Sequence, residues 1–345
     1  MRPGIIHRAK HLLRQLATGP EVTTLPIFRN GKTRRPHAGR PLRLLSWNIQ
    51  YGGGRDRHFF YDGGPDVAVP EQEQRAALAG IGSLIREVDA DIVLLQEVDR
   101  SSTRTGRLDQ LRELLSHHPY PLAISAGYHC VPWVPHPAHH HLGRVDMHLA
   151  VLSRIEVTSA TRIQLARLDE PLYRRFFNLR RAILDARIPL VEGGELRLMN
   201  THLSAFARGD GTLDKQVQAV HGCLAESRNN GQPALVAGDF NALPPGDDPS
   251  RLGPDSRALY PEMTTPLSPL FDAWDSAISA EAFVDEPANW RTYLPPGEMV
   301  PDRTLDYVFS HGLSIHRVDL LPSAAEFSDH LPLLVEFSIP EPRTR

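Results

Sequence analysis

Six apolar runs in the sequence are bordered by side chains that can bind a metal ion or move a proton. In chain order these side chains are Asn48, Glu97, His202, Asp239 with Asn241, Asp306, and Asp329 with His330. A carboxylate next to a buried apolar run is costly unless it faces a partner or a metal. The set is rich in oxygen ligands and contains no cysteine, which favours Mg²⁺ or Mn²⁺ over a thiolate zinc site. Two histidines among several acids also provide a general base and a donor to developing charge.

The segments beside these side chains have the apolar patterns of strands, so strands must position them. Leu305, Tyr307 and Phe309 alternate with Asp306 and Val308, as in a half-buried strand. We expect strands at residues 41–51, 92–95, 149–154, 181–186, 195–199, 234–237, 305–309 and 331–335, and helices at residues 71–88, 109–117, 215–227 and 271–278. If the strands belong to neighbouring sheets, their polar ends meet at one edge and form a single site.

The motifs around the polar residues resemble those of the endonuclease/exonuclease/phosphatase superfamily. They are Leu45-Ser46-Trp47-Asn48, Leu95-Gln96-Glu97, Asn200-Thr201-His202, Gly238-Asp239-Phe240-Asn241, Leu305-Asp306-Tyr307 and Ser328-Asp329-His330. The resemblance covers roughly residues 43–338. It implies an α/β fold, a four-layered α/β sandwich with two packed mixed β-sheets flanked by helices. It also implies hydrolysis of a phosphoester with the help of a divalent metal ion.

The resemblance further implies which residues hold the metal. Glu97 is expected to be the principal ligand of Mg²⁺ or Mn²⁺, with Asn48 and Asp329 completing its surroundings. Such an ion neutralises the phosphate and stabilises the charge that develops in an in-line transition state. Whether one or two ions act is left open by the sequence.

The same resemblance implies the catalytic roles. His330 is expected to be the general base that takes a proton from the attacking water, and Asp306 to orient its imidazole. His202 is expected to donate to a phosphate oxygen or to help the leaving group depart. Asp239 and Asn241 are expected to position the phosphate and the water, and Asp239 is also within the set of possible metal ligands.

Two further sites are candidates for substrate binding. Met147-His148 stands where family members often have Gly-Asn, so His148 is either a substitute phosphate contact or a packed residue. Arg174, Arg175, Arg180 and Arg181 flank an apolar segment, and guanidinium groups near a cleft suit an anionic substrate. Arg181 is the residue we select from this group; the alternative interpretation is a solvated strand edge.

The segment 120–144 is rich in proline and histidine, and we expect it to be a loop. It contains His136, His139, His140 and His141, without the spacing of a helical metal site. Adventitious metal binding on an exposed loop is the favoured interpretation of this histidine cluster.

Composition indicates a globular α/β enzyme with an asymmetric charge distribution. Residues 1–43 carry a net charge of +9 and the remaining residues −12. We therefore expect a basic N-terminal extension at residues 1–40 and a single catalytic domain at residues 41–340. The extension can form a short amphipathic helix able to make weak peripheral contact with an anionic membrane, although docking on the acidic body is favoured. No apolar run is long enough to span a bilayer, and a cytoplasmic location is expected.

Three functions compete at this point. The favoured one is a metal-dependent phosphodiesterase or phosphatase that acts on a small-molecule or lipid-linked phosphoester. The alternative is a Mg²⁺-dependent DNA endonuclease or exonuclease. The net negative charge of the residues after 43 argues against it, because affinity for nucleic acid depends on neutralising the phosphates. A non-catalytic binding protein on the same scaffold is the third, and the complete set of polar residues argues against it.

Overall fold

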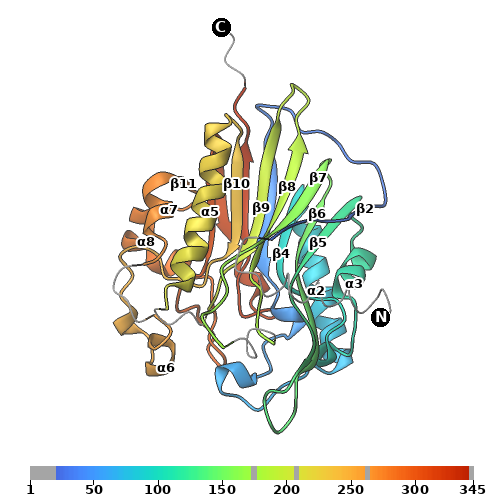
Figure 1. Cartoon of the computed structure of the whole chain (residues 1–345), viewed down its shortest axis with the longest axis vertical. Helices are drawn as coiled ribbons and strands as arrows, with labels where there is room; N and C mark the ends of the chain where they lie inside the picture. Colours follow the sequence, from blue (N-terminus) through green and yellow to red (C-terminus); the bar gives the residue numbers. More distant parts are fainter. Residues whose placement is uncertain (1–20, 172–176, 206–209, 261–264, 342–345) are drawn as a thin grey trace, which may run out of the picture.

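The computed structural model describes residues 21–171, 177–205, 210–260 and 265–341, which fold into two packed mixed β-sheets between layers of helices (Figure 1). This is the predicted four-layered sandwich. The first sheet has the strand order β1 (Val22–Thr24), β7 (Ser159–Gln164), β8 (Ala182–Pro189), β9 (Glu195–His202), β10 (Ala234–Asp239), β12 (Asp306–His311) and β11 (Asp275–Ser276). The second has the order β13 (Ser314–Leu320), β14 (Leu333–Ser338), β3 (Leu42–Asn48), β4 (Ile92–Asp99), β6 (Gly143–Ser153), β5 (Leu122–Val134) and β2 (Ile27–Arg29).

Helices cover the outer faces of both sheets. They are α2 (Glu71–Val88) and α3 (Gln110–His117) on one sheet, and α5 (Thr212–Asn229), α7 (Ser268–Ala273) and α8 (Ala280–Asp285) on the other; the short helix α6 (Pro254–Arg257) lies away from the sheets (Figure 1). In each sheet a long helix connects two parallel neighbours: α2 joins β3 to β4, and α5 joins β9 to β10. Two parallel neighbouring strands need a crossover connection of this kind. Because the strands run in the same direction, their carboxyl ends lie at the same edge of the sheet. Within the described part of the chain, no helix is long and apolar enough to cross a membrane.

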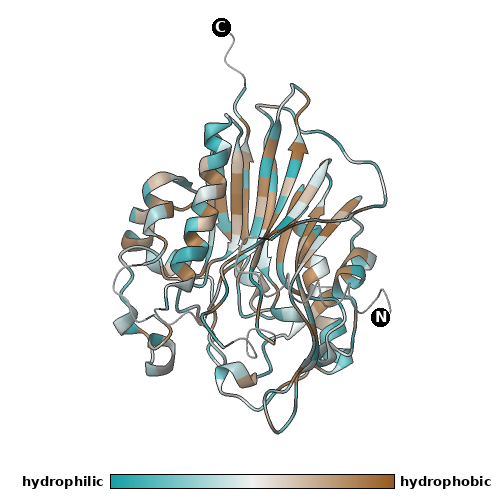
Figure 2. Cartoon of the chain, viewed as in Figure 1, coloured by the Kyte–Doolittle hydropathy of each residue, from teal (hydrophilic) through white to brown (hydrophobic). Residues whose placement is uncertain are grey.

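The central strands are apolar on both faces because both faces are buried. In β3, Leu42 and Leu44 pack into the core between the sheets, whereas Leu45 and Trp47 pack against α2 and α3. This explains why β3 reads as a continuous apolar run rather than an alternating one. The hydropathy colouring shows the same concentration of apolar residues along the strands (Figure 2).

Three predictions about local structure are wrong. The helix expected at residues 271–278 is replaced by α7, which ends at Ala273, and by the strand β11 at Asp275–Ser276. Residues 122–134, expected to be part of a loop, form the long strand β5, which pairs with β6 through two register shifts. In the outer half of β5, Tyr128, His129 and Val131 are buried whereas Cys130, Pro132 and Trp133 are exposed, and the polar residues and the proline obscure a strand's apolar alternation. Residues 22–29 of the expected extension contain β1 and β2, which pair with β7 and β5. Their side chains are mostly exposed, and backbone pairing is supplemented by Ile27, which packs against the core, and by Arg29, which donates to the Val157 carbonyl at 2.8 Å. The rest of the basic tail, residues 1–20, lies outside the described residues.

Candidate active site

The polar residues do converge, and they join the two sheets. Asn48 is the last residue of β3, while Asp239 is the last of β10 and pairs with His202 on one side and Asp306 on the other. Asn48 Nδ2 donates to Asp239 Oδ2 at 3.0 Å, across the sheet interface. The expected edge is therefore a single site built from both sheets.

A bulge in β4 aims Glu97 at this site. The pairing of β4 with β6 shifts register between Leu95 and Val98, and Glu97 adopts a φ of 57°. A left-handed conformation costs a residue with a side chain about 1–2 kcal/mol, and bulges near active sites commonly redirect a side chain. Glu97 Oε1 lies 3.5 Å from Asn48 Nδ2 and 3.9 Å from His202 Nδ1.

His330 and Asp306 form a buried pair. His330 Nδ1 lies 2.7 Å from Asp306 Oδ2, and both residues are almost inaccessible to solvent. Asp306 therefore holds the proton on Nδ1 and leaves Nε2, 3.7 Å from Asp239 Oδ2, facing the site. Burial lowers the pKa of His330, but the charges of Asp306 and Asp239 outweigh it and raise this pKa to about 10. The indole of Trp47 donates to the His330 carbonyl at 2.8 Å and fixes the backbone.

His202 is held neutral between two partners. Its Nε2 lies 3.2 Å from Asp239 Oδ2, and its Nδ1 lies 3.2 Å from the Tyr128 hydroxyl. Burial, together with the positive charges of Arg181 and His330, lowers the pKa of His202 well below its ordinary value. The arrangement assigns the proton to Nε2, which donates to Asp239, while Nδ1 accepts from Tyr128. Tyr128 was missed because its segment was predicted to be a loop.

Asp239 and Asn241 form a tight turn after β10. Asn241 has a φ of 51°, a conformation that asparagine tolerates better than most residues. Its backbone N–H donates to Asp239 Oδ1 at 2.9 Å, and its Nδ2 donates to the Leu203 carbonyl at 3.0 Å. Burial raises the pKa of Asp239 to about 7, with His330 lowering it and Asp306 raising it.

Comparison with known proteins now defines the family. A model described as "Endonuclease/Exonuclease/phosphatase family" matches residues 45–330. The chain belongs to this family. Members of the endonuclease/exonuclease/phosphatase family are hydrolases that act on phosphoesters.

Individual similar proteins share a modest fraction of their sequence with this chain. A UPF0294 protein from Klebsiella pneumoniae (strain 342) is 31% identical over 173 residues, which are 50% of this chain and 52% of the relative. The chain spans about half the length of the curated relatives it matches. An endonuclease/exonuclease/phosphatase from Beutenbergia cavernae DSM 12333 aligns with a TM-score of 0.60 and 22% identity over 87% of this chain and 72% of its own. The human Nocturnin catalytic domain with bound sulfate anion aligns with a TM-score of 0.53 and 21% identity over 91% and 97%. These structures show the shared fold.

The donor set of this family member suits a hard divalent cation. Asp329 is buried, and burial raises its pKa to about 7, with His330 lowering it and Glu97 raising it. Within the described part of the chain, no arginine or lysine pairs with Glu97 or Asp329. The buried Asp329 and the partly buried Glu97 repel one another and form no ion pair with an arginine or lysine of the described residues, so they are oxygen donors that Mg²⁺ or Mn²⁺ would satisfy. The Asn48 amide presents its nitrogen to Glu97 and Asp239, while its Oδ1 accepts from the Gln50 N–H at 3.1 Å.

The two candidate substrate contacts have different surroundings. Arg181 is buried beside the site, with its guanidinium over the Tyr128 ring at 5.3 Å from the centroid. Its buried Nη1 has no hydrogen-bond partner among the described residues. His148 instead contacts Asp146 at 2.9 Å and Cys130 at 3.9 Å. Arg174 and Arg175 lie outside the described residues.

Proposed function

We propose that this protein is a divalent-metal-dependent phosphoester hydrolase that acts on a small-molecule or lipid-linked phosphoester. The observation that carries the proposal is the buried Asp306–His330 pair, which faces Asp239 and adjoins the carboxylates Glu97 and Asp329. An oriented imidazole beside a concentration of buried oxygen donors supplies the two needs of phosphoester hydrolysis. These are activation of water and stabilisation of charge on the phosphate.

Glu97 and Asp329, with Asn48 beside them, would hold Mg²⁺ or Mn²⁺. When bound, the cation supplies charge neutralisation of the phosphate and of the developing transition state. Glu97 is aimed into the site by the β4 bulge, so its carboxylate is positioned before any ligand arrives. Preorganised ligands of this kind reduce the cost of binding.

His330 takes the proton from the attacking water at Nε2. Asp306 keeps the other nitrogen protonated through the 2.7 Å contact and stabilises the imidazolium that forms. The pKa of about 10 reflects the negative charges of Asp306 and Asp239. Positive charge placed among these carboxylates lowers the pKa of His330 and favours the neutral form that a base requires.

The remaining residues orient the phosphate. His202, neutral and protonated at Nε2, donates to a non-bridging oxygen or to the leaving group when the substrate displaces the Asp239 contact. Asp239 and Asn241 position the phosphate and the water at the end of β10. The Nη1 of Arg181, which has no hydrogen-bond partner in the described part of the chain, supplies a further donor to an anionic substrate.

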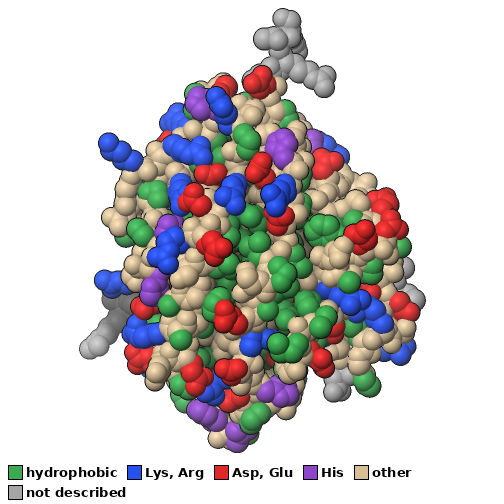
Figure 3. Space-filling view, turned by 180° about the vertical axis from the view of Figure 1, so that it is seen from behind, with side chains coloured by type: hydrophobic (Ala, Val, Ile, Leu, Met, Phe, Trp, Pro, Cys, Tyr) green, Lys and Arg blue, Asp and Glu red, His purple; other side chains and the backbone are tan. Residues whose placement is uncertain are grey.

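The net charge of −12 beyond residue 43 supports a small or lipid-linked substrate over DNA. On the face shown in Figure 3, basic and acidic side chains are interspersed and hydrophobic side chains gather near the middle. Nucleic-acid binding relies instead on a continuous basic surface that tracks phosphates.

The test is a panel of phosphomonoesters, lipid phosphodiesters, nucleotides, and plasmid and abasic DNA, assayed with Mg²⁺ or Mn²⁺. We expect hydrolysis of a non-nucleic-acid ester that EDTA abolishes and His330→Ala reduces at least about 100-fold. His316→Ala, an exposed histidine on β13, is the matched control and should retain activity. Cleavage of DNA alone, with a steep salt dependence, would establish the nuclease alternative. Metal binding without hydrolysis of any substrate would refute the enzyme assignment.

A further inference from the structure

A second group of potential metal ligands lies outside the site described above. Cys130 on β5 and Asp146 and His148 on β6 present ligand atoms that all lie within 4.8 Å of one another. His148 Nε2 is 2.9 Å from Asp146 Oδ1 and 3.9 Å from Cys130 Sγ. None of the three belongs to the proposed catalytic set.

A bulge in β5 brings these side chains to one face. Gly127 pairs with His148 and Cys130 pairs with Asp146, so three residues of β5 advance while β6 advances by two. Residues three apart on a regular strand point to opposite faces. The extra residue cancels this alternation, so that Cys130 points to the face of Asp146 and His148.

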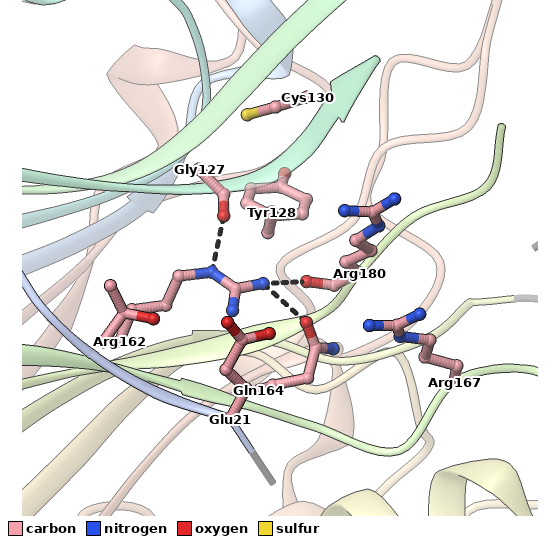
Figure 4. A pocket seen from close by; sticks show the side chains of 9 residues that line it. Glu21, Gly127, Tyr128, Cys130, Arg162, Gln164, Arg167 and Arg180 are labelled. Atoms are coloured by element: carbon pink, nitrogen blue, oxygen red, sulfur yellow. Dashed lines mark hydrogen bonds between the residues drawn. The ribbon is translucent and has the colours of Figure 1, made fainter. Parts of the chain in front are cut away.

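Gly127 leaves the space in which the ligands meet. A Cβ at this position would lie 2.4 Å from Cys130 Sγ and 3.3 Å from His148 Cε1. Gly127 does not have a positive φ, so space rather than backbone conformation explains the glycine. The guanidinium of Arg162 donates to the Gly127 carbonyl at 2.7 Å and to the Arg180 carbonyl at 2.8 Å, which fixes the bulge from beneath (Figure 4).

We propose that Cys130, Asp146 and His148 bind a transition-metal ion of the Zn²⁺ type at a site separate from the catalytic centre. Thiolate and imidazole ligands select such ions over Mg²⁺, and a carboxylate completes a three-ligand set. In a tetrahedral site with bonds of about 2.0–2.3 Å, neighbouring ligand atoms are about 3.3–3.6 Å apart. The observed separations of 2.9 and 3.9 Å bracket this range, so small side-chain rotations bring the three atoms onto one ion.

Neighbouring residues orient the Asp146 carboxylate, and the cluster is accessible to an ion from solvent. Asp146 accepts from Arg144 at its Oδ2, at 3.1 Å, and keeps Oδ1 for the cluster, as a carboxylate held by a neighbouring donor does in metal sites. Cys130 is exposed and lines a cavity of about 180 Å³ together with Arg162 and Arg180 (Figure 4). The exposure of Cys130 gives the ion an entry path from solvent and leaves the fourth coordination position to water.

The experiment uses the sulfur as a reporter. The full-length protein is stripped of metal, saturated with Mg²⁺ and titrated with Co²⁺ while near-ultraviolet absorption is recorded. A thiolate-to-cobalt charge-transfer band is expected, and Zn²⁺ should abolish it by displacement. Co²⁺ at the catalytic centre cannot give this band, because that centre has no cysteine. Cys130→Ser should lose the band, whereas Cys223→Ser, which replaces the other cysteine of the chain on α5, should keep it.

A second measurement addresses the other ligands. Equilibrium dialysis with Zn²⁺ should show about one high-affinity ion per wild-type chain, with affinity reduced at least tenfold in Asp146→Asn and in Gly127→Ala. Absence of the band from the wild-type protein, or its persistence in Cys130→Ser, would show that these residues form only an ion pair beside a thiol. An unchanged Zn²⁺ affinity in both Asp146→Asn and Gly127→Ala would also refute the site.

Discussion

At the scale of residues, the proposed chemistry depends on one carboxylate shared by two imidazoles. Asp239 Oδ2 lies 3.2 Å from His202 Nε2 and 3.7 Å from His330 Nε2. Yet the two histidines have opposite pKa shifts. His330 has the additional charge of Asp306 at 2.7 Å, whereas His202 has burial and the positive charge of Arg181. Opposed shifts in neighbouring groups separate a proton acceptor from a neutral donor.

Asp306→Asn tests the orientation of the base. We expect kcat to fall at least about 100-fold with a small change in KM, because the tautomer and the stabilisation of the imidazolium are lost. Removal of this negative charge also lowers the pKa of His330, so the base is neutral at lower pH and the ascending limb of the pH–rate profile moves to lower pH. Asp319→Asn, in a surface pair with Arg317, is the control. An unshifted limb with normal kcat would exclude Asp306 from this role.

At the scale of elements, hydrogen bonds between the sheets determine how the strand ends meet. Asn200 of β9 accepts from Gln96 Nε2 at 2.8 Å and donates to the Leu95 and Ala150 carbonyls at 3.0 and 2.9 Å. It is fully buried. Asn200 belongs to the Asn-Thr-His motif, and its contacts explain the motif position structurally: it ties β9 to β4 and β6 beside Glu97.

Asn200→Ala should therefore destabilise the fold. The substitution removes three buried hydrogen bonds, and each buried group left unsatisfied costs about 1–3 kcal/mol. We expect a loss of about 3 kcal/mol or more in the free energy of unfolding, measured by urea denaturation. Asn289→Ala, an exposed position bonded to Glu286, should change it by less than about 0.5 kcal/mol. Equal stability of the two variants would contradict the proposed tie between the sheets.

Buried strands could be predicted from the sequence, whereas bulges and edge strands could not. The strands that carry Asn48, Asp239 and Asp306 were predictable because they are buried on both faces and read as apolar runs. The bulges that aim Glu97 and Tyr128 were not, because a bulge arises from pairing between distant strands and leaves no local pattern. The edge strands β1 and β2 were missed for the related reason that they bury little apolar surface.

At the scale of the whole molecule, folding brings like charges together away from water. Burial raises the pKa of Asp239 and of Asp329 to about 7, and for Asp329 the charge of Glu97 adds to the effect while His330 opposes it. The folded protein therefore holds protons that the unfolded chain, with carboxyl pKa values near 4, has released. Stability contributed by these groups is lost as the pH rises from about 4 to about 7.

A divalent cation should offset this loss only where the carboxylates are ionised. We expect Mg²⁺ to raise the thermal unfolding midpoint of the protein substantially at pH 8 and little at pH 5. Below pH 7 the affinity for Mg²⁺ should fall about tenfold per pH unit for each carboxyl proton that Mg²⁺ binding must displace. Differential scanning calorimetry with and without Mg²⁺ at both pH values measures this. In Asp329→Asn the difference between the two pH values should shrink, because one ligand and one perturbed proton are removed together. An equal shift at pH 5 and pH 8 in the wild-type protein would place the Mg²⁺ elsewhere on the molecule and separate the buried carboxylates from metal binding.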